Sequence, residues 1–330
     1  MTTARSDRRA ALLKVAVAGL CFVLFLAMPS IADKGIVFLA GTVALQIVFG
    51  LTWNLMFGQT GLVSFGHASF FAVGGYAYAY VARALPQLHP LVTFTGAGLL
   101  CALIATLVGL VALRRSLGVY FAILTLALSQ IVYLVISSSA ALGREDGFTG
   151  IRRPRLPLGW TTFDLAVGNN YYYFLVLCCA VLSGVVWWVT HSSVGRVFRA
   201  IQQDPERAAF LGIPVQRYRL LSYAIASGIA GIAGALFGPW LQILTPEVGH
   251  WTASARPILY TLLGGVHFFW GPAVGALGFA ILEYGTRTLH GISEIVTGAI
   301  LLAVVLAAPG GILGAISRIV QRLSLRGGAR

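Results

Sequence analysis

Six uncharged polar residues lie inside long apolar runs of this chain, where a buried hydrogen-bonding group is costly unless it meets a partner. They are amides, hydroxyls and one imidazole, and the segment 35–82, which holds most of them, contains no charged residue. Such groups hydrogen-bond a neighbouring helix or a small polar solute. We therefore expect them either to join helices or to line a mildly polar path. The candidates are Gln46, Asn54, Ser64, His67, Ser69 and Gln130.

Their spacing indicates how some of them are arranged. Gln46, Gly50 and Asn54 follow one another at intervals of four and share one helix face. The stretch 58–77, GQTGLVSFGHASFFAVGGYA, continues the polar series. Its glycines permit close approach and bending, so we expect a tightly packed or broken helix there. His67 is expected to be a buried, neutral imidazole.

The residue patterns of an enzyme are missing. The four cysteines have no metal-ligand spacing, and no paired catalytic carboxylates occur. No G-x-x-x-x-G-K-[ST] loop is present, and the only lysines are Lys14 and Lys34. Glu283 and Arg287 are spaced as an ordinary i,i+4 pair near a helix end. We therefore expect no catalytic residue, no metal and no cofactor on this chain.

The segment 191–219 carries strong helix boundary signals. Asp204 suits an N-cap, Pro205 suits the first helical position, and Glu206 complements the helix dipole. Gly212 suits the position after the last helical residue, and Pro214 cannot continue the helix. These signals predict a short helix over 205–211, preceded by another over about 195–203.

Two interpretations of this segment compete. Its arginines could hold a basic loop against anionic lipid. Two capped short helices with an apolar face instead favour docking to a partner protein. We prefer docking, because a loop lying on lipid does not require such defined helix ends.

The composition shows what must position these residues. Of 330 residues, 58% are apolar and 10% are charged, whereas soluble domains carry about 25% charged residues. A membrane span needs about 20 mainly apolar residues. The chain is therefore an all-α polytopic membrane protein, a single domain over 1–330. Ten apolar runs occur, at 11–29, 36–57, 61–81, 91–113, 119–138, 171–190, 220–241, 256–270, 272–289 and 292–309.

Charge predicts the orientation of these runs. The 23 lysines and arginines outnumber the 10 acidic residues, but they are spread over loops, which argues against nucleic acid as a partner. Arginines favour the loops on one side, so both termini and 191–219 are expected in the cytoplasm. The loop 139–170 is expected outside, although its arginines depart from the rule. The first run is interpreted as a retained helix, with a signal peptide as the alternative. The eighth and ninth runs are short enough to be tilted or re-entrant.

Several spaced motifs together resemble one family, the branched-chain amino-acid ABC transporter permeases of the LivM type. An early signature N-x-x-x-G-x-x-G-x-x-S-x-G-H-x-x-F spans 54–70. The segment 192–213 is similar to the family's coupling loop, and shorter similarities are GVYFAILTL, LGG, WGP and PGGILG. One departure is LGREDG at 142–147, where Arg144 replaces a glycine often found in the family.

This resemblance implies a transmembrane permease subunit of an ATP-driven importer in a bacterial inner membrane. Its expected partners are a second homologous permease, two cytoplasmic ATPase subunits that bind ATP and Mg, an extracytoplasmic solute-binding protein and membrane lipid. Branched-chain amino acids, urea, amides and aromatic acids are all substrates that the family suggests. A stand-alone channel or secondary carrier for a small polar solute is the alternative. The residues implied to couple to an ATPase are Gly195, Arg196, Arg199, Asp204, Pro205, Glu206, Ala208, Ala209 and Gly212.

Overall fold

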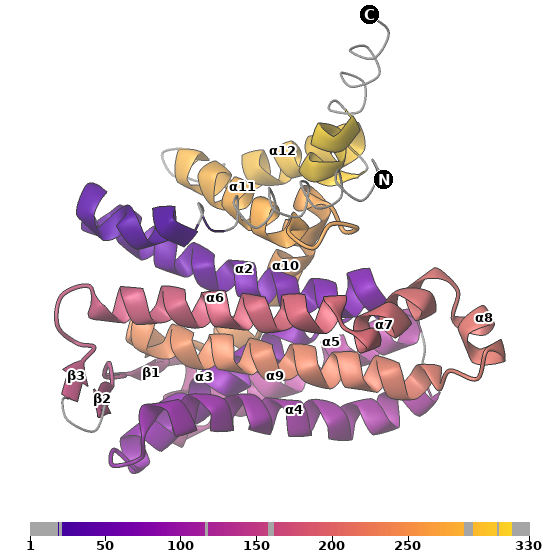
Figure 1. The fold of residues 1–330 in the computed structure, drawn as a ribbon. Coiled ribbons are helices and arrows are strands. Elements are labelled where there is room, and N and C mark those ends of the chain that lie inside the picture. The colour runs from indigo at the N-terminus through magenta and orange to yellow at the C-terminus, as the bar shows by residue number, and fades with distance from the viewer. Residues whose placement is uncertain are drawn as a thin grey trace, which may run out of the picture.

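The computed structural model describes residues 19, 22–115, 118–157, 162–286, 293–308 and 310–318. Helices dominate this part of the chain (Figure 1). A helix over Phe22–Ile31 comes first. The labelled helices are α2 (Lys34–Thr60), α3 (His67–Ala84), α4 (Pro90–Arg115), α5 (Val119–Ser138), α6 (Asn170–His191), α7 (Ser193–Gln203), α8 (Pro205–Phe210), α9 (Val215–Leu241), α10 (Trp251–Gly264), α11 (Gly271–Thr286) and α12 (Ser293–Ala307).

Five of the described helices, α2, α4, α5, α6 and α9, are long and apolar enough to cross a membrane. The labelled helices α2 to α6 and α9 to α12 overlap the second to tenth apolar runs of the sequence. Most of the first run lies outside the described residues, as does Arg287, the expected partner of Glu283. The prediction of an all-α polytopic membrane protein is confirmed.

Two apolar runs differ from the helices that form there, and a glycine in a left-handed or extended positive-φ conformation ends a helix at each. The third run begins at residue 61, but α3 begins only at His67. Gly61 has φ +69°, a left-handed conformation that ends α2. The eighth run was expected at 256–270, whereas α10 covers Trp251–Gly264 and ends because Gly265 has φ +115°.

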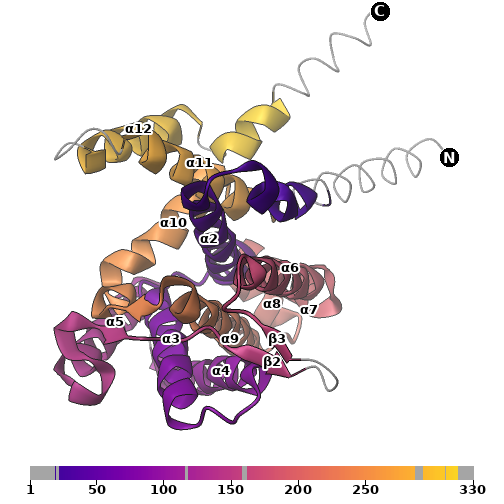
Figure 2. The same cartoon turned by 90° about the vertical axis from the view of Figure 1, so that its left-hand side faces the viewer.

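The helix α2 lies at the centre of the packing. It contacts α6, α7, α9, α10 and α11. In Figure 2, α11 and α12 lie on one side of α2, and α3, α4 and α9 lie on the other. The closest approaches use glycine, because a side chain at Gly74 would meet the backbone of Gly231, and one at Gly234 would meet the backbone of Phe71. These contacts join α3 to α9.

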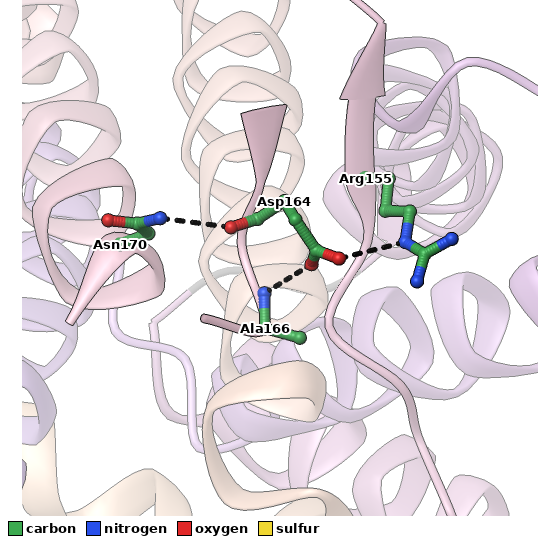
Figure 3. Close-up of polar contacts among 4 residues, drawn as sticks. All are labelled: Arg155, Asp164, Ala166 and Asn170. Atoms are coloured by element: carbon green, nitrogen blue, oxygen red, sulfur yellow. Dashed lines mark hydrogen bonds and ion pairs between the residues drawn. The ribbon is translucent and has the colours of Figure 1, made fainter. Parts of the chain in front are cut away.

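We call residues 192–213, which contain α7 and α8, the coupling segment. The short strands and this segment occupy opposite ends of the long helices (Figure 1). The strand β1 (Phe148–Thr149) pairs antiparallel with β4 (Ile243–Leu244), which follows α9. β2 (Arg155–Pro157) pairs with β3 (Thr162–Asp164). At that hairpin Arg155 Nε donates to Asp164 Oδ2 at 2.9 Å, and the backbone N–H of Ala166 donates to Oδ1 at 2.8 Å (Figure 3). Asn170 Nδ2 donates to the Asp164 carbonyl at 3.0 Å, which ties the hairpin to α6.

Candidate functional site

A break in helical structure separates α2 from α3, and we call residues 61–66 the helix break. The Gly61 N–H donates to the Phe57 carbonyl at 2.9 Å, and the Leu62 N–H donates to the Met56 carbonyl at 3.1 Å. The bond from the N–H of the left-handed Gly61 to the carbonyl four residues before it is the αL type of helix end. The chain then runs without regular structure until His67. The expectation of a broken helix in this stretch agrees with the geometry.

Other helices satisfy the backbone of the helix break. Trp53 Nε1, on α2, donates to the Ser64 carbonyl at 3.0 Å. The Phe65 N–H donates to Thr125 Oγ1, on α5, at 3.1 Å. Gly66 lies so close to α5 that a side chain there would meet the Thr125 carbonyl. Irregular backbone at membrane depth persists only where protein or water satisfies it, and here α2 and α5 provide partners.

His67 is fully buried at the start of α3. Its ring stacks on Phe49, with centroids 5.2 Å apart and planes 8° apart. Its Nε2 lies 2.8 Å from Thr52 Oγ1, while the Thr52 hydroxyl also lies 2.8 Å from the Phe49 carbonyl. Because a hydroxyl has one hydrogen, we assign it to the Phe49 carbonyl and the other hydrogen to Nε2. His67 Nδ1 then carries a free lone pair, and it has no partner among the described residues.

The two serines beside His67 bond within the helix break itself. Ser64 Oγ accepts the Gly66 N–H at 3.3 Å. Ser69 Oγ donates to the Gly66 carbonyl at 2.5 Å. Both serines are buried. We call Ser64, His67 and Ser69 the polar cluster; the two serines bond to the backbone of Gly66, whereas His67 bonds to Thr52 of α2.

Asn54 lies on a different face of α2. It follows Phe49 by five residues, which is about 140° around an α-helix. Its Nδ2 lies 3.5 Å from the Phe268 carbonyl, and its buried Oδ1 has no partner in the described part of the chain. On the same face, a side chain at Gly50 would meet Pro272, and one at Gly58 would meet Asn54 itself. The connection between α10 and α11 thus covers this face.

The remaining two candidates stand apart from this cluster. Gln46 and Gln130 are each half-buried, and Gln130 Oε1 has no partner among the residues described. The structure therefore gathers three of the six candidates at the helix break and places the other three elsewhere. Sequence reasoning missed Thr52 and Thr125, whose only signal was a hydroxyl inside an apolar run.

The coupling segment is shaped by local bonds. Ser192 caps α7, since its Oγ accepts the Gly195 N–H at 3.3 Å. Gly195 is buried against the Thr190 carbonyl, where a side chain would collide. Arg199 Nη1 donates to that same carbonyl at 2.7 Å, and both Arg196 and Arg199 are exposed. These contacts fix α7 across the end of α6.

Asp204 joins α7 to α8. Its Oδ1 accepts the Arg207 N–H at 3.0 Å, and Pro205 and Glu206 occupy the first turn of α8 as expected. The predicted end at 211 is one residue too long, because α8 ends at Phe210. Gly212 then adopts φ +82°, the left-handed conformation expected of it.

The surface of α8 is uneven. Ala208 is 2% exposed, so it packs inward and offers no surface to a partner, which corrects the expectation that it would. Ala209 is exposed, and Phe210 and Leu211 are 91% and 76% exposed. Large apolar side chains that project this far into solvent are typical of a binding surface. Sequence reasoning placed Phe210 and Leu211 on an apolar face without singling them out.

Comparison with known proteins agrees with this geometry. Residues 35–308 match the model of a family described as "Branched-chain amino acid transport system / permease component". The chain is 27% identical to the high-affinity branched-chain amino acid transport system permease protein LivM of Escherichia coli K12, over 88% of this chain and 73% of that protein. It is 25% identical to LivH of the same strain, over 81% of this chain and 90% of that protein. No solved structure matches the chain. The chain therefore belongs to the permease-component family of branched-chain amino acid ABC transport systems, and it is a multi-pass membrane transport subunit, not an enzyme.

Proposed function

We propose that this permease subunit forms part of the translocation path for branched-chain amino acids or a related small solute, and that a cytoplasmic ATPase drives it through α7 and α8. The observation that carries the coupling role is the C-terminal end of α8, where Phe210 and Leu211 are 91% and 76% exposed on a helix whose start is capped by Asp204. The exposed apolar side chains of Phe210 and Leu211, at one end of the long helices, are suited to insertion into a cleft of an ATPase subunit. The named substrates of the curated relatives support the choice of solute.

The complex that we propose contains four further kinds of component. A second homologous permease completes the membrane part, since LivM and LivH are separate, related permease proteins. Two cytoplasmic ATPase subunits bind ATP and Mg, because this sequence has no Walker A loop. A solute-binding protein docks on the outside, at 139–170 and the turn 245–256. Membrane lipid surrounds the helices.

The orientation that we propose follows from the charges and the arrangement of the two ends. The end that carries α7 and α8 also carries Arg114, Arg196, Arg207 and Arg217. Arginine-rich ends face the cytoplasm, so the β1–β4 end faces outward from the inner membrane of a bacterium. Both termini are then cytoplasmic.

Within the membrane, we propose that the helix break carries the polar wall of the path. Ser64, His67 and Ser69 lie at the break, and His67 Nδ1 is a buried acceptor without a partner among the described residues. Because all three side chains are buried, we propose that they meet a solute only when the helix break changes shape. Asn54, Gln46 and Gln130 are retained as secondary candidates from other faces.

Reconstitution tests the proposed function. The complete complex is placed in liposomes that contain ATP, with the binding protein and radiolabelled leucine outside. We expect uptake that requires ATP and stops when the Walker A lysine of the ATPase subunits is replaced by alanine. Uptake by this chain alone, without ATP or any ATPase subunit, would show a channel or carrier and overturn the proposal.

A further inference from the structure

The last turn of α2 lies where the coupling segment meets the helix break. Thr60, the final residue of α2, is completely buried. Its Oγ1 lies 2.6 Å from the Met56 carbonyl and 3.1 Å from Ser222 Oγ on α9. Because the short contact takes the Thr60 hydrogen, only Ser222 can donate between the two hydroxyls, and it shares its single hydrogen with the Arg219 carbonyl, which lies 3.0 Å from Ser222 Oγ. A residue of the helix that precedes the break is thus in direct polar contact with α9.

The other partner in this contact is α9, which is connected closely to α8. Residues 211–214 join the two helices, and Ser222 lies about two turns into α9. The side chain of Tyr218, one turn before Ser222, meets Phe198 of α7 edge to face, with centroids 6.3 Å apart. A rigid movement of α7 and α8 therefore reaches Ser222 through packed helix and only a four-residue connection.

The same turn of α2 contacts α7 directly. The two helices pack together, and Arg199 Nη1 lies 3.5 Å from Gln59 Oε1. At that distance the hydrogen bond is weak, so this contact does not fix α2 rigidly to α7. Thr60 and Gln59 are consequently flanked by α9 and by α7.

The helix break begins at the next residue, Gly61. Backbone without i to i−4 hydrogen bonds can change its dihedral angles at less cost than a helix can. The far side of the break is anchored to another helix, since the Phe65 N–H donates to Thr125 Oγ1 at 3.1 Å. A displacement of Thr60 relative to α5 therefore has to be absorbed within 61–66.

We infer that Thr60 and Ser222 are positioning residues for coupling, and that their hydrogen bond conveys movement of α8 and α9 into the helix break. This inference rests on the proposed function, because it requires an ATPase that moves α8. It assigns to the end of α2 a role that the motif at 191–219 does not contain. The helix break becomes the element that changes shape during the transport cycle.

The test measures solute taken up per ATP hydrolysed by the complete reconstituted complex. Ser222→Ala and Thr60→Val each remove one of the two hydroxyls, and therefore the contact between them, with little change in side-chain volume. We expect about threefold to tenfold less uptake per ATP, the range that corresponds to loss of one hydrogen bond. ATP hydrolysis and assembly with the ATPase subunits are expected to persist. The double variant should be no worse than either single variant, because both remove the same bond.

Two controls separate coupling from ordinary packing. Thr60→Ser keeps the hydroxyl and should restore the wild-type ratio. Thr106→Val removes a half-buried hydroxyl of α4 that donates to Ala102 of its own helix at 2.7 Å, and it should leave the ratio unchanged. If Thr60→Val fails to assemble, Ser222→Ala decides the outcome. An unchanged ratio in Ser222→Ala, in a wild-type complex whose uptake requires ATP, overturns this inference alone, whereas ATP-independent uptake by the wild type overturns the proposed function.

Discussion

The helix break and α8 are both short irregularities between long helices, but their hydrogen bonds come from different places. The helix break takes its partners from elsewhere in the chain, such as Thr125 of α5 and Trp53 of α2. The short helix α8 is held by its neighbours in sequence, with Asp204 capping Arg207 and Ile213 bonding to Ala208. One element is buried and depends on tertiary packing, while the other is exposed and defines its own shape. We propose that the buried helix break and the exposed α8 are the two parts of this subunit that couple ATP hydrolysis to transport.

The largest expected effect breaks the buried side of this comparison. Gly66→Val places a side chain against the Thr125 carbonyl, which cannot move without shifting α5. We expect the free energy of unfolding to fall by about 3 kcal/mol, the upper part of the range for overpacking. Thermal unfolding in detergent measures this loss. Gly96→Ala, at a position with nothing within 4 Å, is the matched control and should be nearly neutral. Equal stability of the two variants would mean that the helix break is not tightly packed.

The next effect concerns the exposed side. Phe210→Ala removes a ring that is 91% exposed, so stability of this chain should not change. If the ring is an interface anchor, its loss should cost about 2 kcal/mol of binding, or roughly thirtyfold in affinity for the ATPase subunits. Co-purification at graded ATPase concentrations measures the change. Tyr120→Ala, at a 75% exposed position of α5, should leave this affinity unaltered. Full affinity in Phe210→Ala would remove the tip of α8 from the interface.

A smaller effect sharpens the idea that α8 defines its own shape. Gly212 has φ +82°, a conformation that strains a β-branched residue by about 1–3 kcal/mol. Gly212→Val should therefore lower transport per ATP about fivefold while the long helices stay folded. Gly212→Asn, which tolerates the left-handed conformation, should retain most coupling. Transport by Gly212→Val at the wild-type ratio would show that this helix end does not position α8.

The last prediction concerns His67. Thr52→Val removes the hydroxyl that lies 2.8 Å from His67 Nε2 and leaves the buried imidazole N–H without its partner. We expect a loss of about 1–2 kcal/mol of stability, measured by thermal unfolding. Thr190→Val, at the coupling end, provides a control, because its hydroxyl bonds within its own helix turn and to His191. A stability loss no greater than the control would mean that His67 does not depend on Thr52.

The difference between the two regions also explains what the sequence could predict. The end of α7 and the start of α8 followed from Asp204 and Pro205, and the end of α8 followed from Gly212 to within one residue, because caps and helix stops act within four residues. The helix break was expected only in outline, and its partners were missed. The bond from Phe65 to Thr125 spans 60 residues, and the bond from Ala68 to Ser254 spans 186. No local pattern encodes such distances.

The polar candidates show the same limit. Spacing by four placed Gln46 and Asn54 on one face of α2, as an α-helix requires. Spacing could not show that this face meets the connection between α10 and α11, whereas His67 packs on Phe49 and Thr52 about 140° away. Residues of one polar series thus serve different interfaces, because the break after Gly61 changes the direction of the chain. Composition alone was sufficient to predict a membrane protein, because the fractions of apolar and charged residues do not depend on which helices contact one another.

The antiparallel pairing of β1 with β4 has a consequence for signalling across the membrane. The strand β4 directly follows α9, and α9 begins beside α8 and extends about 40 Å over its 27 residues. The helix α9 therefore connects the end that carries α8 to β1, within the loop 139–170, at the opposite end. Binding free energies linked through one element are reciprocal. If one protein binds the loop 139–170, a second protein binds α8, and α9 links the two sites, then each protein must change the affinity of the chain for the other by the same factor.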